Sequence, residues 1–435
     1  MSCIFVAGQY FCYDNPSVIE TEIEKDLKIN SDEWAMIFTI YSWPNIVLPL
    51  LGGIFVDKVG IRPAIMLYSG LVTFGQMFVM IGGYAKNYAL ILTGRAIFGM
   101  GGECLGAAQV TIISMWFRGQ ELNFALGVSL SLSQFFAVIN GWAIPEVYEE
   151  GGLGAAFLVG FMICLFSLGI AYWVVRIDEK ADQQEQRQIL EEDKFIISDI
   201  KYFTFAFWLL VIDSLFTYIT VYPYIQDITK KLKVKYNFTP KRSALMFGIP
   251  YIVAAVLSPI LGFISDRVGM RIKFLILSHM VFILAFFISA TLPDCEEGDV
   301  CNYELAPLLF VGIAYSIFLS FFWGAVPLTV EEKSIGTAYG VCQCFQNIAL
   351  SFATILSTRI LEITRDQFGE GSNYAGLDGF SIGMNFIGLF VAIFLLCWDK
   401  HKCEGVLNTP GYYQTEYEEE EEDNSKAENG LNIDN

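Results

Sequence analysis

Five ionisable side chains stand inside strongly apolar stretches of the sequence, where a charge is costly and usually has a function. They are Arg95, Glu103, Asp213, His279 and Arg359. A buried carboxylate can bind a proton, a cation or an organic ammonium group, and a guanidinium can bind a carboxylate. These residue types in this setting therefore point to the binding of small charged molecules.

Glu103 has the surroundings that most favour a binding role. It follows Gly101 and Gly102 and precedes Gly106, so a ligand or a facing helix can approach closely. Its carboxylate is suited to hold the ammonium end of a zwitterion. The alternative is an internal salt bridge, with Arg95 about 12 Å earlier on the same helix or with another helix, that only fixes packing.

Asp213 and His279 carry weaker signals. Asp213 is expected to bind cations or protons, or simply to face water. His279 is one of only two histidines, and a packed or interfacial position is expected rather than a proton relay.

The sequence carries no pattern of a known catalytic centre. It has no nucleophile elbow, Walker loop, zincin helix or dinucleotide fingerprint in a suitable context. Its ten cysteines have no metal-ligand spacing and stand mostly in apolar stretches. We therefore predict that the protein is not an enzyme and uses no cofactor or metal.

The composition indicates that membrane-spanning helices position these residues. Of 435 residues, 54% are hydrophobic and only 17% charged, which excludes an ordinary soluble domain. A helical crossing needs roughly 20 apolar residues. Eleven complete spans are predicted at 35–56, 61–83, 88–117, 122–145, 153–175, 202–224, 243–265, 272–292, 305–330, 336–361 and 376–398.

A twelfth span is implied by the apolar residues 2–12, which are too few to cross a bilayer. We expect the first helix to be truncated, with a reentrant or interfacial segment as the alternative. The predicted division is an N-terminal transmembrane half (1–176), a charged connector (177–201), a C-terminal transmembrane half (202–398) and an acidic tail (399–435). Part of the net charge of −19 comes from that tail.

Loop lysines and arginines suggest the orientation, because they are enriched on the cytoplasmic side. Their distribution favours a cytoplasmic loop at 57–62, which also places the connector and the acidic tail in the cytoplasm. The basic segment 230–242 lies on the other side, where we interpret it as a long exposed loop. The same side holds Cys295 and Cys301, which oxidising conditions would allow to form a disulfide.

Two predicted spans end in closely similar decapeptides, which identify the architecture. Each has Gly, Asp, a basic residue, Gly and Arg at the same spacing between two apolar spans. The pattern resembles the signature loop of the major facilitator superfamily, and this resemblance implies an all-α polytopic membrane protein with two six-helix halves. The two segments are Gly53-Ile-Phe-Val-Asp57-Lys58-Val-Gly60-Ile-Arg62 and Gly262-Phe-Ile-Ser-Asp266-Arg267-Val-Gly269-Met-Arg271.

The same resemblance implies a gating role for Asp57, Arg62, Asp266 and Arg271. A carboxylate is favourable at the positive N-terminus of a helix. Asp57 is expected to face the start of the span 336–361, which is the eleventh when the truncated first helix is counted. Asp266 is expected to face the start of the span 122–145, the fifth in the same count. These contacts would close the cytoplasmic side.

Four further segments resemble one family of this superfamily, that of major facilitator superfamily domain-containing protein 1. The likeness extends from Phe11 to Trp398 and implies a uniporter that exports dipeptides from lysosomes with a glycosylated accessory membrane protein. The segments are Phe11-Cys-Tyr-Asp14-Asn-Pro16, Tyr41-Ser-Trp43-Pro44-Asn45, Gly94-Arg95-Ala-Ile-Phe-Gly99-Met-Gly101-Gly102-Glu103 and Gly336-Thr-Ala-Tyr339-Gly340-Val-Cys-Gln343.

The family match also implies a central substrate cavity. Two positions depart from the family: Gln134 stands where animal members carry an arginine, and Asp213 where the family position is apolar. Either Arg95 then holds the substrate carboxylate, or the substrate preference differs from that of the animal members. The polar and aromatic residues expected around the cavity are Tyr41, Trp43, Tyr218, Trp323, Tyr339, Gln343, Gln346 and Asn347.

Other functions remain open at the level of the sequence, since a fold does not fix an activity. A non-transporting membrane sensor with the same fold is one alternative. A carrier of sugars or organic anions is another.

Overall fold

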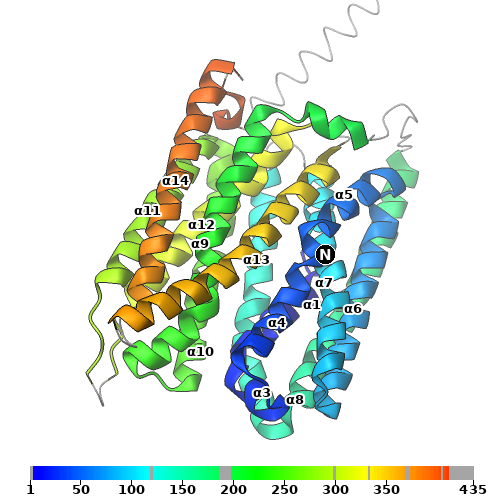
Figure 1. The fold of residues 1–435 in the computed structure, drawn as a ribbon. Helices are drawn as coiled ribbons and strands as arrows, with labels where there is room; N and C mark the ends of the chain where they lie inside the picture. Colours follow the sequence, from blue (N-terminus) through cyan, green and yellow to red (C-terminus); the bar gives the residue numbers. More distant parts are fainter. Residues whose placement is uncertain are drawn as a thin grey trace, which may run out of the picture.

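The computed structural model describes residues 3–117, 121–185, 197–296, 300–331, 334–368, 373–402 and 405–410. Most of the predicted acidic tail and the middle of the charged connector lie outside these residues. The described chain is a bundle of long helices joined by short loops (Figure 1).

The helices of the first half of the chain lie together on one side of the bundle, and those of the second half on the other (Figure 1). The first group is α1 (Ala7–Tyr13), α2 (Asn15–Val18), α3 (Glu20–Leu27), α4 (Ser31–Ser42), the 3-10 turn η1 (Pro44–Ile46), α5 (Leu48–Val59), α6 (Ile61–Ala85), α7 (Tyr88–Trp116) and α8 (Leu122–Glu185). The second is η4 (Ile197–Tyr202), α9 (Phe205–Tyr236), α10 (Pro240–Val268), α11 (Arg271–Thr291), α12 (Leu305–Ala325), η5 (Val326–Thr329), α13 (Ile335–Phe368), α14 (Asn373–Lys402) and η7 (Val406–Asn408).

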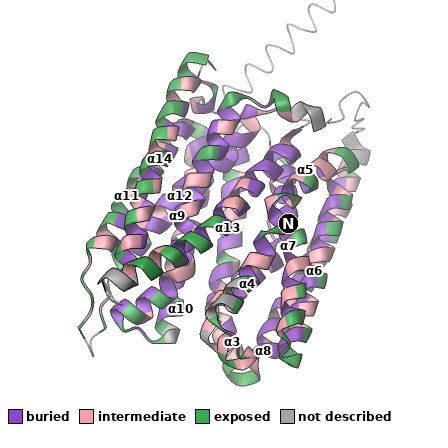
Figure 2. Ribbon diagram, viewed as in Figure 1, coloured by how far each residue is buried: buried purple, intermediate pink, exposed green. Residues whose placement is uncertain are grey.

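Nine of the described helices are long and apolar enough to cross a membrane, or ten if the bent pair α4 and α5 counts as one span. That pair bends by 47°. Pro44 and Pro49 lie on either side of the bend, and a proline interrupts the helical hydrogen-bond ladder. The chain is therefore a multi-span membrane protein, and its outward faces carry most of the exposed residues (Figure 2).

Helix α8 accounts for two of the predicted spans. It turns at Gly152, whose φ of 70° suits glycine better than any other residue. The chain thus crosses, reverses and crosses again between residues 122 and 185.

The predicted loop at 230–242 is wrong. Residues 230–236 are the last two turns of α9, and the next helix begins at Pro240. We predicted a loop because lysines interrupt the apolar pattern at this point. In the structure, however, Lys231 and Lys235 are buried. Lys231 is neutralised by Glu304 at 2.8 Å and Asp378 at 3.0 Å, so three helix ends enclose this cluster of charges.

The bundle has two distinct ends. One, here the aspartate end, carries Asp57 and Asp266, and the other, the disulfide end, carries the bonded pair Cys295 and Cys301. The expected disulfide is therefore present in the structure. At the aspartate end, residues 405–410 fold back on the loop before α11, where Met270 N–H donates to the carbonyl of Asn408.

Candidate binding cavity between the two halves

A cavity of about 110 Å³ lies between the two halves of the bundle. Its volume is below the roughly 300 Å³ of a typical ligand site, so this conformation is contracted around it. Eight helices or their ends contribute polar or aromatic side chains. They are Gln9, Tyr10, Tyr13 and Asp14 from α1 and its end, Tyr41, Glu103, Gln109, Ser129, Gln134, Tyr218, Tyr222, Tyr251, Tyr315, Trp323, Gln343 and Gln346.

Glu103 is the carboxylate that the middle of α7 contributes to the cavity wall. The Tyr41 hydroxyl donates to its Oε1 at 2.6 Å, and the Asn347 side chain hydrogen-bonds to it from the opposite half. Gly102 and Gly106 let these groups approach: a side chain at Gly102 would be 3.0 Å from the Tyr41 hydroxyl. Glu103 thus has hydrogen-bonding partners and no cationic one among the described hydrogen bonds and ion pairs.

Helix α13 presents the expected polar face. Gln343 and Gln346 line the cavity, and Gln346 donates to the hydroxyl of Tyr222 on α9. Asn347 donates to the carbonyl of Gln343 one turn earlier. Gln343 and Asn347 lie beside α7 of the other half, whereas Gln346 contacts α9 of its own half.

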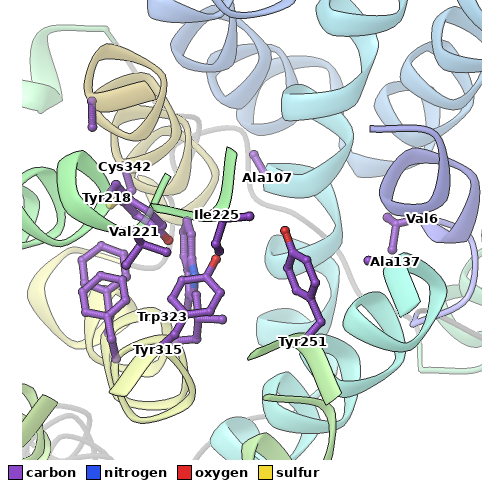
Figure 3. Close-up of a cluster of buried hydrophobic side chains, with 14 of the residues drawn as sticks. Val6, Ala107, Ala137, Tyr218, Val221, Ile225, Tyr251, Tyr315, Trp323 and Cys342 are labelled. Atoms are coloured by element: carbon purple, nitrogen blue, oxygen red, sulfur yellow. The ribbon is translucent and has the colours of Figure 1, made fainter. Parts of the chain in front are cut away.

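Aromatic side chains form most of the wall on the C-terminal half. Figure 3 shows Tyr218, Tyr315 and Trp323 grouped together on these helices, with Tyr251 nearer to the N-terminal half. Tyr218 and Tyr222 stack at 5.4 Å between ring centroids. Such rings pair an apolar face with a hydroxyl group, so they can hold an organic ligand while donating hydrogen bonds to it.

Tyr339 does not line the cavity. Its hydroxyl pairs with Ser114 of α7 at 3.1 Å and donates to the carbonyl of Trp323. It therefore ties both halves together next to the cavity.

Arg95 lies behind the cavity wall. Its guanidinium donates to the carbonyls of Cys12 and Tyr13, at 3.1 and 3.0 Å, and lies 5.7 Å from the ring centroids of Phe38 and Phe98. The side chain is buried and holds the end of α1. Neither a salt bridge with Glu103 nor a contact with the cavity occurs in this conformation of the described residues.

Three other predicted binding residues lie in different surroundings. Gln134 lines the cavity from α8. Trp43 is 61% exposed on the outside of the bundle, and Asp213 is fully buried against His279, inside the C-terminal half. The exposed Arg359 pairs with Glu362 one turn further along α13.

The sequence reasoning missed Asp14, a second carboxylate on the cavity wall. It is buried at the end of α1 and hydrogen-bonds to Tyr251 of the opposite half. Asp14 stands in the segment from Phe11 to Pro16, which carries part of the family resemblance. Among the described lining residues there are thus two carboxylates and no lysine, arginine or histidine.

Asp57 and Asp266 each bridge the two halves at the aspartate end. Asp57 accepts hydrogen bonds from the backbone N–H and the hydroxyl of Thr337 at the start of α13, at 2.8 and 2.7 Å. Asp266 accepts from the backbone N–H groups of Asn123 and Phe124 at the start of α8, at 3.1 and 2.8 Å. Both carboxylates use unpaired N–H groups of a helix N-terminus.

The two arginines of the repeated loops contact their own halves. Arg62 pairs with Asp178 near the end of α8 at 2.6 Å. Arg271 donates to the carbonyl of Thr409, in the segment that follows α14, at 3.0 Å. They fix the position of each loop within its half.

The amino-acid sequence matches a known family over residues 3–354, that of the Major Facilitator Superfamily. Proteins named "Lysosomal dipeptide transporter MFSD1" are among its curated relatives. The protein from Danio rerio is 31% identical over 427 residues, covering 93% of this chain and 87% of its own. The protein from Homo sapiens is 31% identical over 383 residues, covering 83% and 79%.

Solved structures share the fold. The proton:xylose symporter XylE superposes with a TM-score of 0.69 at 13% identity, over 88% of this chain and 93% of its own. The human organic anion transporter MFSD10 gives a TM-score of 0.66 at 11% identity, over 90% and 96%. At such identities the likeness shows the architecture and says nothing of the substrate.

Proposed function

The chain belongs to the Major Facilitator Superfamily and is a transporter rather than an enzyme, and we propose that it carries dipeptides or related zwitterions out of a lysosome-like compartment. The names of its curated relatives support both the substrate and the compartment. A sugar or organic-anion carrier is the competing proposal.

The buried carboxylate of Glu103 is the observation that carries this proposal. It lines the cavity, is oriented by Tyr41 and lacks a cationic partner among the described hydrogen bonds and ion pairs. The ammonium group of a substrate would supply the positive charge that this carboxylate lacks. The charge-assisted hydrogen bond between the two groups would be strong. An organic anion would instead meet two carboxylates, Glu103 and Asp14, and be repelled.

The substrate carboxylate has a different kind of partner in this proposal. The amide of Gln134 and the hydroxyl group of Tyr218 can donate hydrogen bonds to it without supplying a charge. We therefore propose that the amino end of the peptide is recognised by charge and the carboxyl end by neutral donors.

Transport proceeds by alternating access in this proposal. The contacts of Asp57 and Asp266 close the aspartate end, which we assign to the cytoplasm. The disulfide supports a luminal assignment of the other end, because disulfides persist in oxidising compartments. Substrate would enter from the disulfide end and leave when the two aspartate contacts open.

Counterflow in proteoliposomes tests the function. Purified protein preloaded with unlabelled dipeptide is expected to accumulate labelled dipeptide, with competition by other dipeptides and none by sugars or organic anions. Competition by xylose or by a dicarboxylate instead of dipeptides would refute the proposal. An accessory glycoprotein is also proposed, on the family resemblance alone, and reconstitution with and without membrane extract would reveal its effect.

The substitution Glu103→Gln tests the role of the carboxylate. It should weaken dipeptide binding by roughly 10- to 150-fold, because a hydrogen bond to a charged group contributes about 1.5–3 kcal/mol. Wild type should bind N-acetylated dipeptides poorly, and the variant should no longer distinguish them from free dipeptides. Lower thermal stability with an unchanged preference for a free amino terminus would instead assign Glu103 to packing.

A further inference from the structure

A second buried polar cluster lies in the C-terminal half, away from the cavity wall. His279 of α11 contacts Asp213 of α9 through Nε2, at 3.0 Å from Oδ1, and Asn385 of α14 through Nδ1, at 3.0 Å from the amide oxygen. All three side chains are fully buried. We propose that Asp213 and His279 form a proton-binding site whose occupancy makes transport pH-dependent.

The amide of Asn385 fixes which groups donate. Its Nδ2 donates to the Thr220 hydroxyl at 3.2 Å and to the Ser381 carbonyl at 2.9 Å. A flipped amide would point its oxygen at the Ser381 carbonyl and leave two acceptors in contact. The oxygen of Asn385 therefore faces His279, and Nδ1 must carry a hydrogen to donate to it.

The contact on the other side of the ring then requires a second proton. With Nδ1 protonated, a neutral imidazole has only a lone pair at Nε2. An ionised Asp213 would bring another lone pair to 3.0 Å from it, which is repulsive. The contact forms only when one proton lies between Nε2 and Oδ1, so the pair is imidazolium with carboxylate or imidazole with carboxylic acid.

The surroundings favour this proton-loaded, electrically neutral pair. Asp213 is the one charged group that acts on His279 among the described residues of the elements packed around it, and the facing group on α14, Asn385, is uncharged. The second oxygen of Asp213 is buried and has no hydrogen-bond partner among the described residues. Loss of the proton would leave a buried, unpaired carboxylate, which is strongly unfavourable.

Loss of the proton must therefore accompany a movement of the helices. The pair is inaccessible to water in this conformation, so the proton can reach water only when the surrounding helices α9, α11 and α14 move apart. Helix α9 also carries Tyr218, five residues beyond Asp213 and about 7.5 Å along the axis, on the cavity wall. The same helix thus links proton binding to the shape of the cavity.

Nitrogen NMR tests the site directly and needs no substrate. The chain has two histidines, so selective ¹⁵N-histidine labelling gives two signals, and His401→Gln identifies that of His279. We expect Nδ1 of His279 to be protonated throughout pH 5–8. A neutral ring with the proton on Nε2 and a bare Nδ1 would overturn the proposal.

The substitution Asp213→Asn tests the consequence for transport. Its amide can donate to Nε2 of a neutral imidazole, so the contact survives without a titrating proton. The test uses a Glu20→Gln background, because the buried Glu20 at the disulfide end titrates in the same pH range. In that background, counterflow at equal pH on both sides should change at least about fivefold between pH 5 and 8, and adding Asp213→Asn should make the profile nearly flat. The exposed control Glu362→Gln should keep the profile of that background.

An Asp213→Asn variant that retains the pH profile of its background would refute the proposal. If Asp213→Asn does not fold, the protonation of His279 in the wild-type protein still decides. The NMR result also separates this inference from the proposed substrate, because a failure of dipeptide transport leaves the ring protonation unchanged.

Discussion

At the scale of single residues, the orientation of Glu103 depends on the hydroxyl of Tyr41, which donates to it at 2.6 Å. A buried carboxylate without such a donor costs free energy and loses its fixed direction. The ring of Tyr41 is itself held against Tyr13, at 5.0 Å between centroids. The two aromatic residues thus connect the ends of α1 and α4 with the carboxylate of α7.

We predict that Tyr41→Phe weakens dipeptide binding about tenfold, because the hydrogen bond to the charged carboxylate is lost. Isothermal titration or competition in the counterflow assay measures this loss. Tyr68→Phe is the matched control: it removes a buried hydroxyl that donates to the Gly52 carbonyl, so stability should fall while affinity stays unchanged. Equal affinities of Tyr41→Phe and wild type would contradict the role of Tyr41.

Glu20 carries a pH dependence of its own at the disulfide end. It belongs to α3, outside the membrane-crossing helices, and burial raises its pKa to about 7 although Lys230 and Lys233 of α9 oppose the shift. In water its pKa would be about 4.3. The closed form therefore binds more protons than an open form between these values, so closure at this end is favoured in acid and weakens as the pH rises towards 7.

We predict that Glu20→Gln removes this dependence and keeps the disulfide end closed at neutral pH. With pKa values of about 7 in the closed form and about 4.3 in the open form, the closed-to-open ratio of wild type should fall roughly 70-fold between pH 5 and 8. Spin labels on α3 and α9 would report the distance between the halves by pulsed electron paramagnetic resonance. Glu22→Gln, on the same helix, should behave as wild type, and a pH-dependent distance in Glu20→Gln would contradict the prediction.

The sequence identified Glu103 and the amides of α13, because charged and polar residues in apolar spans are conspicuous. It did not give the position of Arg95, whose guanidinium is taken up by backbone carbonyls at the end of α1. Every residue has a backbone carbonyl, so the sequence does not show which carbonyls will accept hydrogen bonds from an arginine. The gating and substrate roles of these residues remain proposals.

At the scale of elements, the repeated decapeptide predicted where two loops lie, and the structure places each aspartate against a helix N-terminus of the other half. Helix boundaries were less predictable. The extension of α9 through Lys231 depends on Glu304 and Asp378 from two distant helices. A hydropathy pattern cannot register charges that are neutralised only after folding.

We predict that Asp57→Asn shifts the protein toward conformations open at the aspartate end. The amide cannot accept both hydrogen bonds from Thr337 with the strength of a carboxylate, and the loss is about 1.5–3 kcal/mol at most. The transport rate should change more than substrate affinity, because the cavity is untouched. Equal losses of binding and transport in a folded variant would argue against a gating role.

At the scale of the whole molecule, the two halves meet at the aspartate end through glycines as well as aspartates. A Cβ on Gly53 would be 2.3 Å from the carbonyl oxygen of Gly336, and one on Gly262 would be 2.3 Å from that of Asn123. Both obstacles are backbone atoms of the opposite half, so no side chain can move aside. Each decapeptide thus contributes an aspartate that hydrogen-bonds to the opposite half and a glycine that lets the two halves pack tightly at this end.

We therefore predict that Gly53→Ala and Gly262→Ala each separate the halves at the aspartate end while leaving the helices intact. A methyl group at 2.3 Å from an oxygen must move about 1 Å away from it to reach ordinary van der Waals contact. The aspartate hydrogen bonds next to it would then lengthen. Spin labels at the aspartate ends of α5 and α13 should show a longer distance, and counterflow should slow. Gly70→Ala on α6 is the matched control, because a Cβ there meets no atom within 4 Å and alanine favours the helix. If the alanine at position 53 gave the same distance distribution as the alanine at position 70, the two halves would not be held together by this close approach, and the aspartates alone would have to account for the closed end.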